Sequence, residues 1–324
     1  MNVLVIGSSS IDLFAKPVDE EELEESDNKV SFNLGDKIPV DVYSLSLGGN
    51  ASNVSSGLKS LGCKVTLYTF LGNDILSSHI KNTLEKRGIE LIVEEENSNA
   101  SSMSFILNLK GDRVIFSHHS NKRYSFDEGK VKSAFDMIYL TSMGEGWENA
   151  YQKILVFAKS KNVPIAFSPG SHQLNEITEA FFETLKNSKI LMCNMSEAKK
   201  ILEAKGISSE DPKKIFTHLK SLGPEILSIT EGDRGAFAVD DKNNIFHIEP
   251  LVINSHEKTG AGDAYASGFL GAFIKGKSAE EAMIWGSVNS YSVMQKVGAQ
   301  NGLATEDEIN EYIKNHQDFK AQKI

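Results

Sequence analysis

The 324-residue sequence predicts an α/β fold with a mainly parallel central sheet flanked by helices and a small protruding β-sheet. Three observations predict it: short apolar runs, amphipathic stretches of helical length between them, and two segments of alternating polarity in the first third. Strands that alternate with helices are typical of βαβ units and a parallel sheet. The sequence has no internal repeat and no low-complexity linker, so one domain over residues 1–324 is expected.

The first apolar run, Val3–Ile6, ends at Gly7 and has the pattern of a buried strand. Five similar runs predict further strands at Val65–Phe70, Met137–Leu140, Val163–Phe167, Ile190–Cys193 and Glu225–Ile229. Amphipathic patterns predict helices at Asn73–Arg87, Trp147–Ser160 and Asp211–Leu222.

Two segments interrupt this alternation. Residues 29–47 show period-two patterning, with turn signals at Gly35–Asp36 and Pro39. Residues 102–117 form two strand-like runs around Lys110–Gly111–Asp112, which predicts a hairpin. We expect these segments to form a lid from roughly residues 13–47 and 101–120.

Composition excludes several classes of protein. The formal net charge of −10 argues against a nucleic-acid partner, because affinity for phosphate backbones comes from clustered Lys and Arg. The sequence contains no apolar run near the length of about 18 residues that a membrane span needs. Cys63 and Cys193 lie in separate segments and are expected to be buried free thiols. No signal-peptide pattern is recognisable, so a cytoplasmic protein is expected.

The stretch HEKTGAGDAYASGFLGAF, residues 256–273, combines a glycine turn, a carboxylate and an apolar helix. A helix N-terminus carries free N–H groups and about half a positive charge, so Gly260, Ala261 and Gly262 could present amides to a phosphate oxygen. Asp263 follows at once. It is interpreted either as a helix N-cap or as a base that takes a proton from a hydroxyl beside this anion hole.

A second glycine-containing stretch, GGNASNVSSGLKSLG, covers residues 48–62. It lacks G-x-G-x-x-G and does not directly follow the first strand, which argues against a nicotinamide-dependent oxidoreductase. We interpret it as a loop that leads into a helix. Asn50 and Asn53 either offer amides to the hydroxyls of a polyol or serve as turn and cap residues.

Five motifs in order resemble the PfkB (ribokinase-like) family of carbohydrate and nucleoside kinases over nearly the whole chain. They are IGSSSIDLF with Asp12, GGNASN at 48–53, NMSE at 194–197, TEGDRG at 230–235 and TGAGD at 259–263. The resemblance implies a ribokinase-like fold with a β lid. It also implies an ATP-dependent kinase that transfers the γ-phosphoryl group to a primary hydroxyl of a nucleoside or a sugar.

The resemblance implies a role for each matching residue. Asp263 would deprotonate the acceptor hydroxyl while the 260–262 backbone stabilises the moving phosphoryl group. The acceptor would be held by Asp12, Gly49, Asn50 and Asn53. ATP would contact Thr230, Gly232 and Gly235, and Asn194 and Glu197 would organise Mg²⁺ and the phosphates through water.

Two departures from the family pattern concern cation and substrate. Glu257 and Lys258 replace the usual residues before the glycine turn. Glu257 is therefore a candidate for a K⁺ site, and Lys258 either replaces the cation in part or points to solvent. Met143 stands where ribokinases carry a Glu, and its apolar surface favours an adenosine-like nucleoside. The alternative is a sugar kinase for ribose, fructose or ketodeoxygluconate.

Three further expectations concern a histidine pair, a function of a different class and the oligomeric state. His118 and His119 follow the second lid run and are interpreted either as acceptor or phosphate contacts or as structural residues. A non-catalytic nucleotide or sugar sensor on the same fold is the hypothesis from a different class, and loss of Asp263 or of the anion hole would be its mark. Exposed β edges favour a homodimer through the lid.

Overall fold

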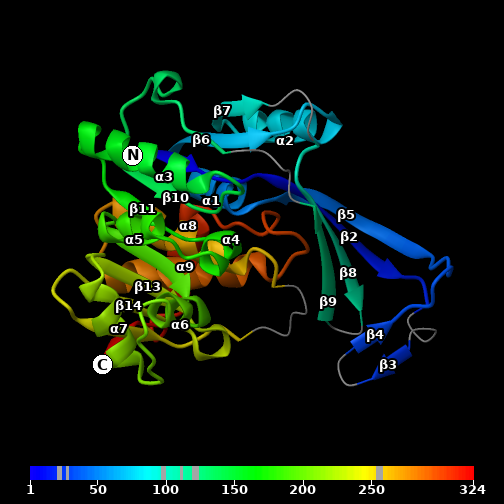
Figure 1. Cartoon of the computed structure of the whole chain (residues 1–324). Coiled ribbons are helices and arrows are strands. Elements are labelled where there is room, and N and C mark those ends of the chain that lie inside the picture. Colours follow the sequence, from blue (N-terminus) through cyan, green and yellow to red (C-terminus); the bar gives the residue numbers. More distant parts are fainter. Residues whose placement is uncertain (20–23, 27–28, 96–99, 110–111, 119–123, 253–257) are drawn as a thin grey trace.

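In a computed structural model, the described residues are 1–19, 24–26, 29–95, 100–109, 112–118, 124–252 and 258–324. A large sheet carries helices on both faces, and a smaller sheet extends away from it (Figure 1). This arrangement confirms the predicted α/β fold and its protruding β-sheet.

The large sheet is mainly parallel. Neighbouring strands from β13 across to β7 run parallel, and β14, β15 and β16 add an antiparallel edge. In spatial order the strands are β16 (Gln322–Lys323), β15 (Ile245–Ile248), β14 (Ala236–Val239), β13 (Ile226–Thr230), β12 (Ile190–Asn194), β11 (Ile165–Phe167), β10 (Met137–Leu140), β1 (Asn2–Ile6), β6 (Lys64–Leu71) and β7 (Glu90–Glu95). All six strands expected in this sheet are present. β7 and the three antiparallel strands were not predicted from the sequence; β14, β15 and β16 have four residues or fewer.

Both faces of this sheet are buried, as in other parallel sheets. Val3 and Val5 of β1 pack into one apolar cluster, and Leu4 and Ile6 pack into the other. The first cluster is covered by α1 (Asn50–Ser60), α2 (Ile75–Lys86), α8 (Ala261–Ile274), α9 (Ala279–Val293) and α10 (Glu306–Asn315). The second is covered by α3 (Trp147–Lys161), α4 (Ser171–Asn175), α5 (Glu179–Lys186), α6 (Met195–Glu203) and α7 (Pro212–Ser221).

The three helices expected from amphipathic patterns correspond to α2, α3 and α7, to within two residues at each end. Two short 3₁₀ turns, η1 (Glu128–Lys130) and η2 (Gly232–Arg234), complete the helical elements described. Within the described ranges, no helix has the length and apolar character that crossing a bilayer requires.

The smaller sheet, which we call the lid sheet, has the strand order β5 (Val40–Gly48), β2 (Ser10–Pro17), β8 (Met103–Leu109) and β9 (Asp112–His118). The antiparallel β8–β9 pair confirms the hairpin. β2 begins at Ser10, ahead of the expected lid segment 13–47. A separate antiparallel pair joins β3 (Glu24–Ser26) and β4 (Lys29–Ser31).

Close packing of α1 against α8 positions the site. A Cβ atom at Gly57 of α1 would lie 2.1 Å from Ser267 Oγ of α8, so no larger residue fits this contact. The N-termini of the two helices are thereby brought together, although they are about 210 residues apart in sequence.

Candidate active site

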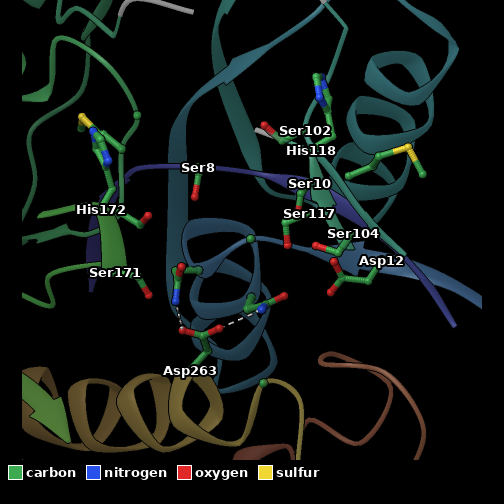
Figure 2. A pocket seen from close by; sticks show the side chains of 18 of the residues that line it. Ser8, Ser10, Asp12, Ser102, Ser104, Ser117, His118, Ser171, His172 and Asp263 are labelled. Atoms are coloured by element: carbon green, nitrogen blue, oxygen red, sulfur yellow. Dashed lines mark hydrogen bonds between the residues drawn. The ribbon is translucent and has the colours of Figure 1, made fainter. Parts of the chain in front are cut away.

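A cavity of about 570 Å³ lies between the lid sheet, the segments after β1 and β10, and the first residues of α1 and α8. Figure 2 shows Asp263 at the bottom of the view, with Asp12 and Ser104 on the lid side to the right. Such a cavity at the carboxyl ends of parallel strands is where ligands bind in open α/β sheets.

Asp263 is the third residue of α8 and points toward the start of α1. Asn50 Nδ2 donates a hydrogen bond to Asp263 Oδ1 at 3.0 Å, and Asn53 Nδ2 donates to Oδ2 at 2.8 Å. The N-cap of α8 is Gly260, without a side-chain cap. The interpretation of Asp263 as an N-cap was therefore wrong, because the N-cap lies three residues earlier, at Gly260.

The protonation of Asp263 reflects two opposing effects. Burial raises the pKa of Asp263, the hydrogen bonds from Asn53 and Asn50 oppose that rise, and the net value is about 6. A carboxyl group with a pKa near the working pH is suited to general-base catalysis. Burial also raises the pKa of Glu197, and the negative charge of Asp263 adds to that rise.

The turn before Asp263 is shaped by two different glycines. Gly260 has φ 80°, and a Cβ there would lie 2.4 Å from the Cβ of Ala299. A Cβ at Gly262 would meet no atom within 4 Å, so the first turn of α8 faces open space at that point. The Ala261 N–H donates to the Lys258 carbonyl at 3.2 Å. The anion-binding role of these residues remains a prediction.

All four residues predicted to hold the acceptor line the same cavity as Asp263: Asp12, Gly49, Asn50 and Asn53. Asp12 is buried on β2 and packs against Gly48. A Cβ at Gly48 would lie 2.3 Å from the carboxylate oxygens of Asp12. Gly49 caps α1 with φ 85° and packs against the backbone of residues 8–10. The predicted acceptor residues and the predicted base are thus brought together.

The residues predicted to bind ATP lie at the ends of two adjacent strands, outside the lining of this cavity. Asn194 of β12 pairs in register with Thr230 of β13. Asn194 and Glu197 also form a capping box at α6, with both hydrogen bonds at 2.9 Å. Gly232 and Gly235 have φ 58° and 76°, and a Cβ at Gly235 would lie 1.9 Å from the carbonyl oxygen of Ile248.

Most of the polar side chains that line the cavity were not predicted from the sequence. Seven serines contribute to it, together with Tyr124, Glu145 and His172. The serines are Ser8, Ser10, Ser102, Ser104, Ser117, Ser142 and Ser171. A signal was available for Ser8 and Ser142, which come two residues after the predicted strands Val3–Ile6 and Met137–Leu140.

Met143 lines the cavity, but only 1% of its surface is exposed. The expectation that it presents an apolar surface to the acceptor is therefore not supported. His118 also lines the cavity. His119 lies outside the described residues, and so does Glu257 with the expected K⁺ site.

Within the described part of the chain, no three His, Cys, Asp or Glu residues gather as a metal site. Cys63 and Cys193 are buried and free, as expected. Burial raises the pKa of both thiols, so neither has the thiolate character of a reactive cysteine.

The sheet, its lid and a carboxylate at a helix N-terminus, together with the five motifs, are the features expected of a small-molecule kinase of the α/β type. The model of the pfkB family carbohydrate kinases matches residues 2–306, and the chain belongs to this family. Phosphotransfer to a hydroxyl group is the activity of the family.

Individual relatives are distant. An uncharacterized sugar kinase of Archaeoglobus fulgidus is 27% identical over 256 residues, which cover 76% of this chain and 98% of the relative. The ribokinase of Haemophilus influenzae is 24% identical over 280 residues, 84% of this chain and 88% of the relative. The structure of a putative ribokinase II from E. coli, in complex with ATP and Mg²⁺, has a TM-score of 0.80 at 17% identity. It covers 97% of this chain and 99% of that one, a similarity that shows the fold.

Proposed function

We propose that this protein transfers the γ-phosphoryl group of ATP to a primary hydroxyl of a small, neutral, hydroxyl-rich acceptor. One observation carries the proposal: Asp263, held by two asparagine amides, lies at the start of α8 in a cavity lined by hydroxyl groups. Phosphoryl transfer to an alcohol needs a base that deprotonates the alcohol and, beside it, backbone N–H groups that stabilise the moving phosphoryl group.

Some of the lining residues would bind the acceptor, and Asp263 would act as the base. Asp12 and Asn50 would orient the acceptor by accepting from and donating to its hydroxyl groups. Asp263 would take the proton of the attacking hydroxyl, and the first turn of α8 would face the negative charge that develops on the phosphoryl oxygens. The open space at Gly262 leaves room for those oxygens beside the backbone.

The described residues fit ATP with Mg²⁺. Mg²⁺ bound to ATP phosphates keeps several waters and needs few protein ligands, which agrees with the small number of acidic groups at the strand ends. The ion would neutralise phosphate charge during transfer. Asn194 and Glu197 would contact its waters, and the turn with Thr230, Gly232 and Gly235 would hold the nucleotide.

The cavity lining favours a sugar over a nucleoside base as the group recognised. Seven serines, Asp12 and Glu145 suit hydroxyl groups, and Met143 adds little apolar surface. Glu145 lies two residues after Met143, which stands at the position where ribokinases carry a Glu. The described lining contains no Lys or Arg, which favours ribose, fructose or adenosine over the carboxylate of ketodeoxygluconate.

The test is release of ADP in the presence of ribose, fructose, adenosine or ketodeoxygluconate, with and without K⁺. Asp263→Asn should lower kcat by roughly 10³-fold because the base is lost, while calorimetry shows nearly unchanged ATP binding. Asp241→Asn, at an exposed position, is the matched control. Retention of most of the kcat by Asp263→Asn would remove the base assignment, and a wild-type protein that binds ATP without turnover would favour the sensor.

We also propose that the protein forms a homodimer through its lid sheet. Val42 and Leu45 on β5 and Phe116 on β9 are 56%, 52% and 53% exposed, and these strands are the two edges of the lid sheet. Light scattering should give twice the chain mass, and a Phe116→Lys variant should give the monomer mass. A wild-type monomer at micromolar concentration would contradict this proposal.

A further inference from the structure

A chain of buried polar side chains leads from the proposed base to a guanidinium group. Asn53 Nδ2 donates to Asp263 Oδ2 at 2.8 Å, and Gln300 Nε2 donates to Asn53 Oδ1 at 2.7 Å. Gln300 Oε1 accepts from Ser56 Oγ at 3.1 Å and from Arg87 Nη1. Asn53, Ser56 and Gln300 are buried, with 3–6% of their surface exposed.

We propose that Gln300 and Arg87 are positioning residues that fix the orientation of the Asn53 amide, so that its NH₂ group faces Asp263. The inference rests on the proposed role of Asp263 as the base. Neither residue itself lines the acceptor cavity, whereas Asn53 does, so both would act through Asn53.

The direction of each hydrogen bond carries the argument. The two ends of an amide side chain have nearly the same shape but opposite hydrogen-bonding character, so the partners decide which end points where. A guanidinium group only donates, so Gln300 turns its oxygen to Arg87 and its NH₂ to Asn53. Asn53 then accepts on its oxygen and keeps its NH₂ for Asp263. A reversed Asn53 would place an oxygen against the carboxylate.

The same segment supports the turn before the base. Gln300 lies in the connection between α9 and α10, and its neighbour Ala299 packs against Gly260. Arg87 comes from the C-terminal end of α2, and Asn53 comes from α1. Four segments distant in sequence therefore converge on the environment of one carboxylate.

Gln300→Glu tests the orientation directly. The introduced carboxylate can still accept from Arg87 and Ser56, but it has no NH₂ group for Asn53. The Asn53 amide should then reverse, donate to the new carboxylate and turn its oxygen to Asp263. The pKa of Asp263 should rise from about 6 by about one unit, because its charged form loses a donor. The other titratable groups that interact with Asp263, Glu197 and Tyr139, are unchanged in this variant.

Two readouts report the shift. The carboxyl carbon of Asp263 can be titrated by NMR with ¹³C-labelled aspartate, assigned by the signal lost in Asp263→Asn. The acidic limb of the kcat profile should move by the same amount, with roughly fivefold lower kcat at pH 6 and a loss that approaches tenfold at lower pH. Asn301→Asp makes the same chemical change at the next, exposed residue and should leave both readouts unchanged.

Each outcome decides between explanations. A folded Gln300→Glu protein whose Asp263 titrates as in the wild type would overturn the inference. If Gln300→Glu does not fold, Arg87→Gln is measured instead. It should raise the pKa of Asp263 by a smaller amount, because Gln300 is then free to reverse, and an unchanged value would also overturn the inference. The NMR titration requires no turnover, so a failure of the proposed kinase function is distinguishable from a failure of this inference.

Discussion

The start of α8 and the lid sheet each bring one aspartate to the same cavity, but they are built differently. Asp263 stands on a helix whose residues Phe269 and Leu270 are fully buried in the core of the large sheet. Asp12 stands on a sheet whose own buried apolar cluster consists of Ala15, Leu107 and Leu109. The lid sheet also exposes large apolar side chains such as Phe116.

The difference indicates which part of the site is rigid. A carboxylate that accepts protons must stay in place to within a fraction of an ångström, and buried helices provide that precision. Segments with few buried contacts open and close more readily. We infer that the lid sheet selects and encloses the acceptor, and that the start of α8 performs the proton transfer.

The largest effect should come from Gly260→Ala, on the rigid side. The substitution combines a positive φ with a clash against Ala299, and should cost about 3 kcal/mol of unfolding free energy. Gly276→Ala is the matched control, because it has φ 83° but no atom within 4 Å, and should cost about 1 kcal/mol. Urea denaturation measures both. If both variants lost the same unfolding free energy, the clash with Ala299 would not contribute to the cost of Gly260→Ala.

Asp12→Asn probes the lid side of the comparison. It should raise the KM for the acceptor by about 10- to 100-fold with kcat nearly unchanged, because a charged hydrogen-bond partner of the bound acceptor is lost. Asp41→Asn on β5, at an exposed position, should leave KM unchanged. If Asp12→Asn lowered kcat as strongly as Asp263→Asn, both regions would share the chemistry and the division would be wrong.

The burial of Asp263 predicts a pH-dependent effect on stability. Its pKa is raised from 3.8 to about 6 on folding, so the folded state is penalised when the group is charged, and wild-type stability falls as the pH rises through this range. Asp263→Asn lacks the penalty. Its melting temperature relative to wild type should therefore be higher at pH 8 than at pH 4, by about 3 °C in calorimetry. If the difference in melting temperature between the variant and the wild type were the same at pH 4 and pH 8, burial would not destabilise the carboxylate.

Ser104→Ala should give the smallest effect. Ser104 lies on β8 in the cavity lining, and loss of one neutral hydrogen bond should raise the acceptor KM about threefold. Steady-state kinetics with the accepted sugar measures it, with Ser209→Ala, outside the cavity, as the control. An unchanged KM would place the acceptor away from the lid sheet.

The parts of the fold that could be predicted from the sequence are those with a local pattern of residues. The strands Val65–Phe70 and Met137–Leu140 were recognisable because a buried strand is a short apolar run. The interpretation of Asp263 as an N-cap placed the start of α8 three residues late, because Ala261 and Gly262 carry no capping or amphipathic signal. Gln300 has no local pattern at all, and its contacts with Asn53 and Arg87 span 247 and 213 residues.

The sequence by itself determined the alternation of strands and helices, the hairpin at residues 102–117 and the identity of Asp263 as the residue to examine. These features depend on the order of neighbouring side chains, which the sequence states directly. Only the tertiary structure decided that Asp263 is held by Asn50 and Asn53, that serines line the cavity and that Gln300 supports Asn53. Those contacts depend on how α1, α8 and the segment after α9 pack together, and side chains far apart in the chain acquire their partners only when that packing is complete.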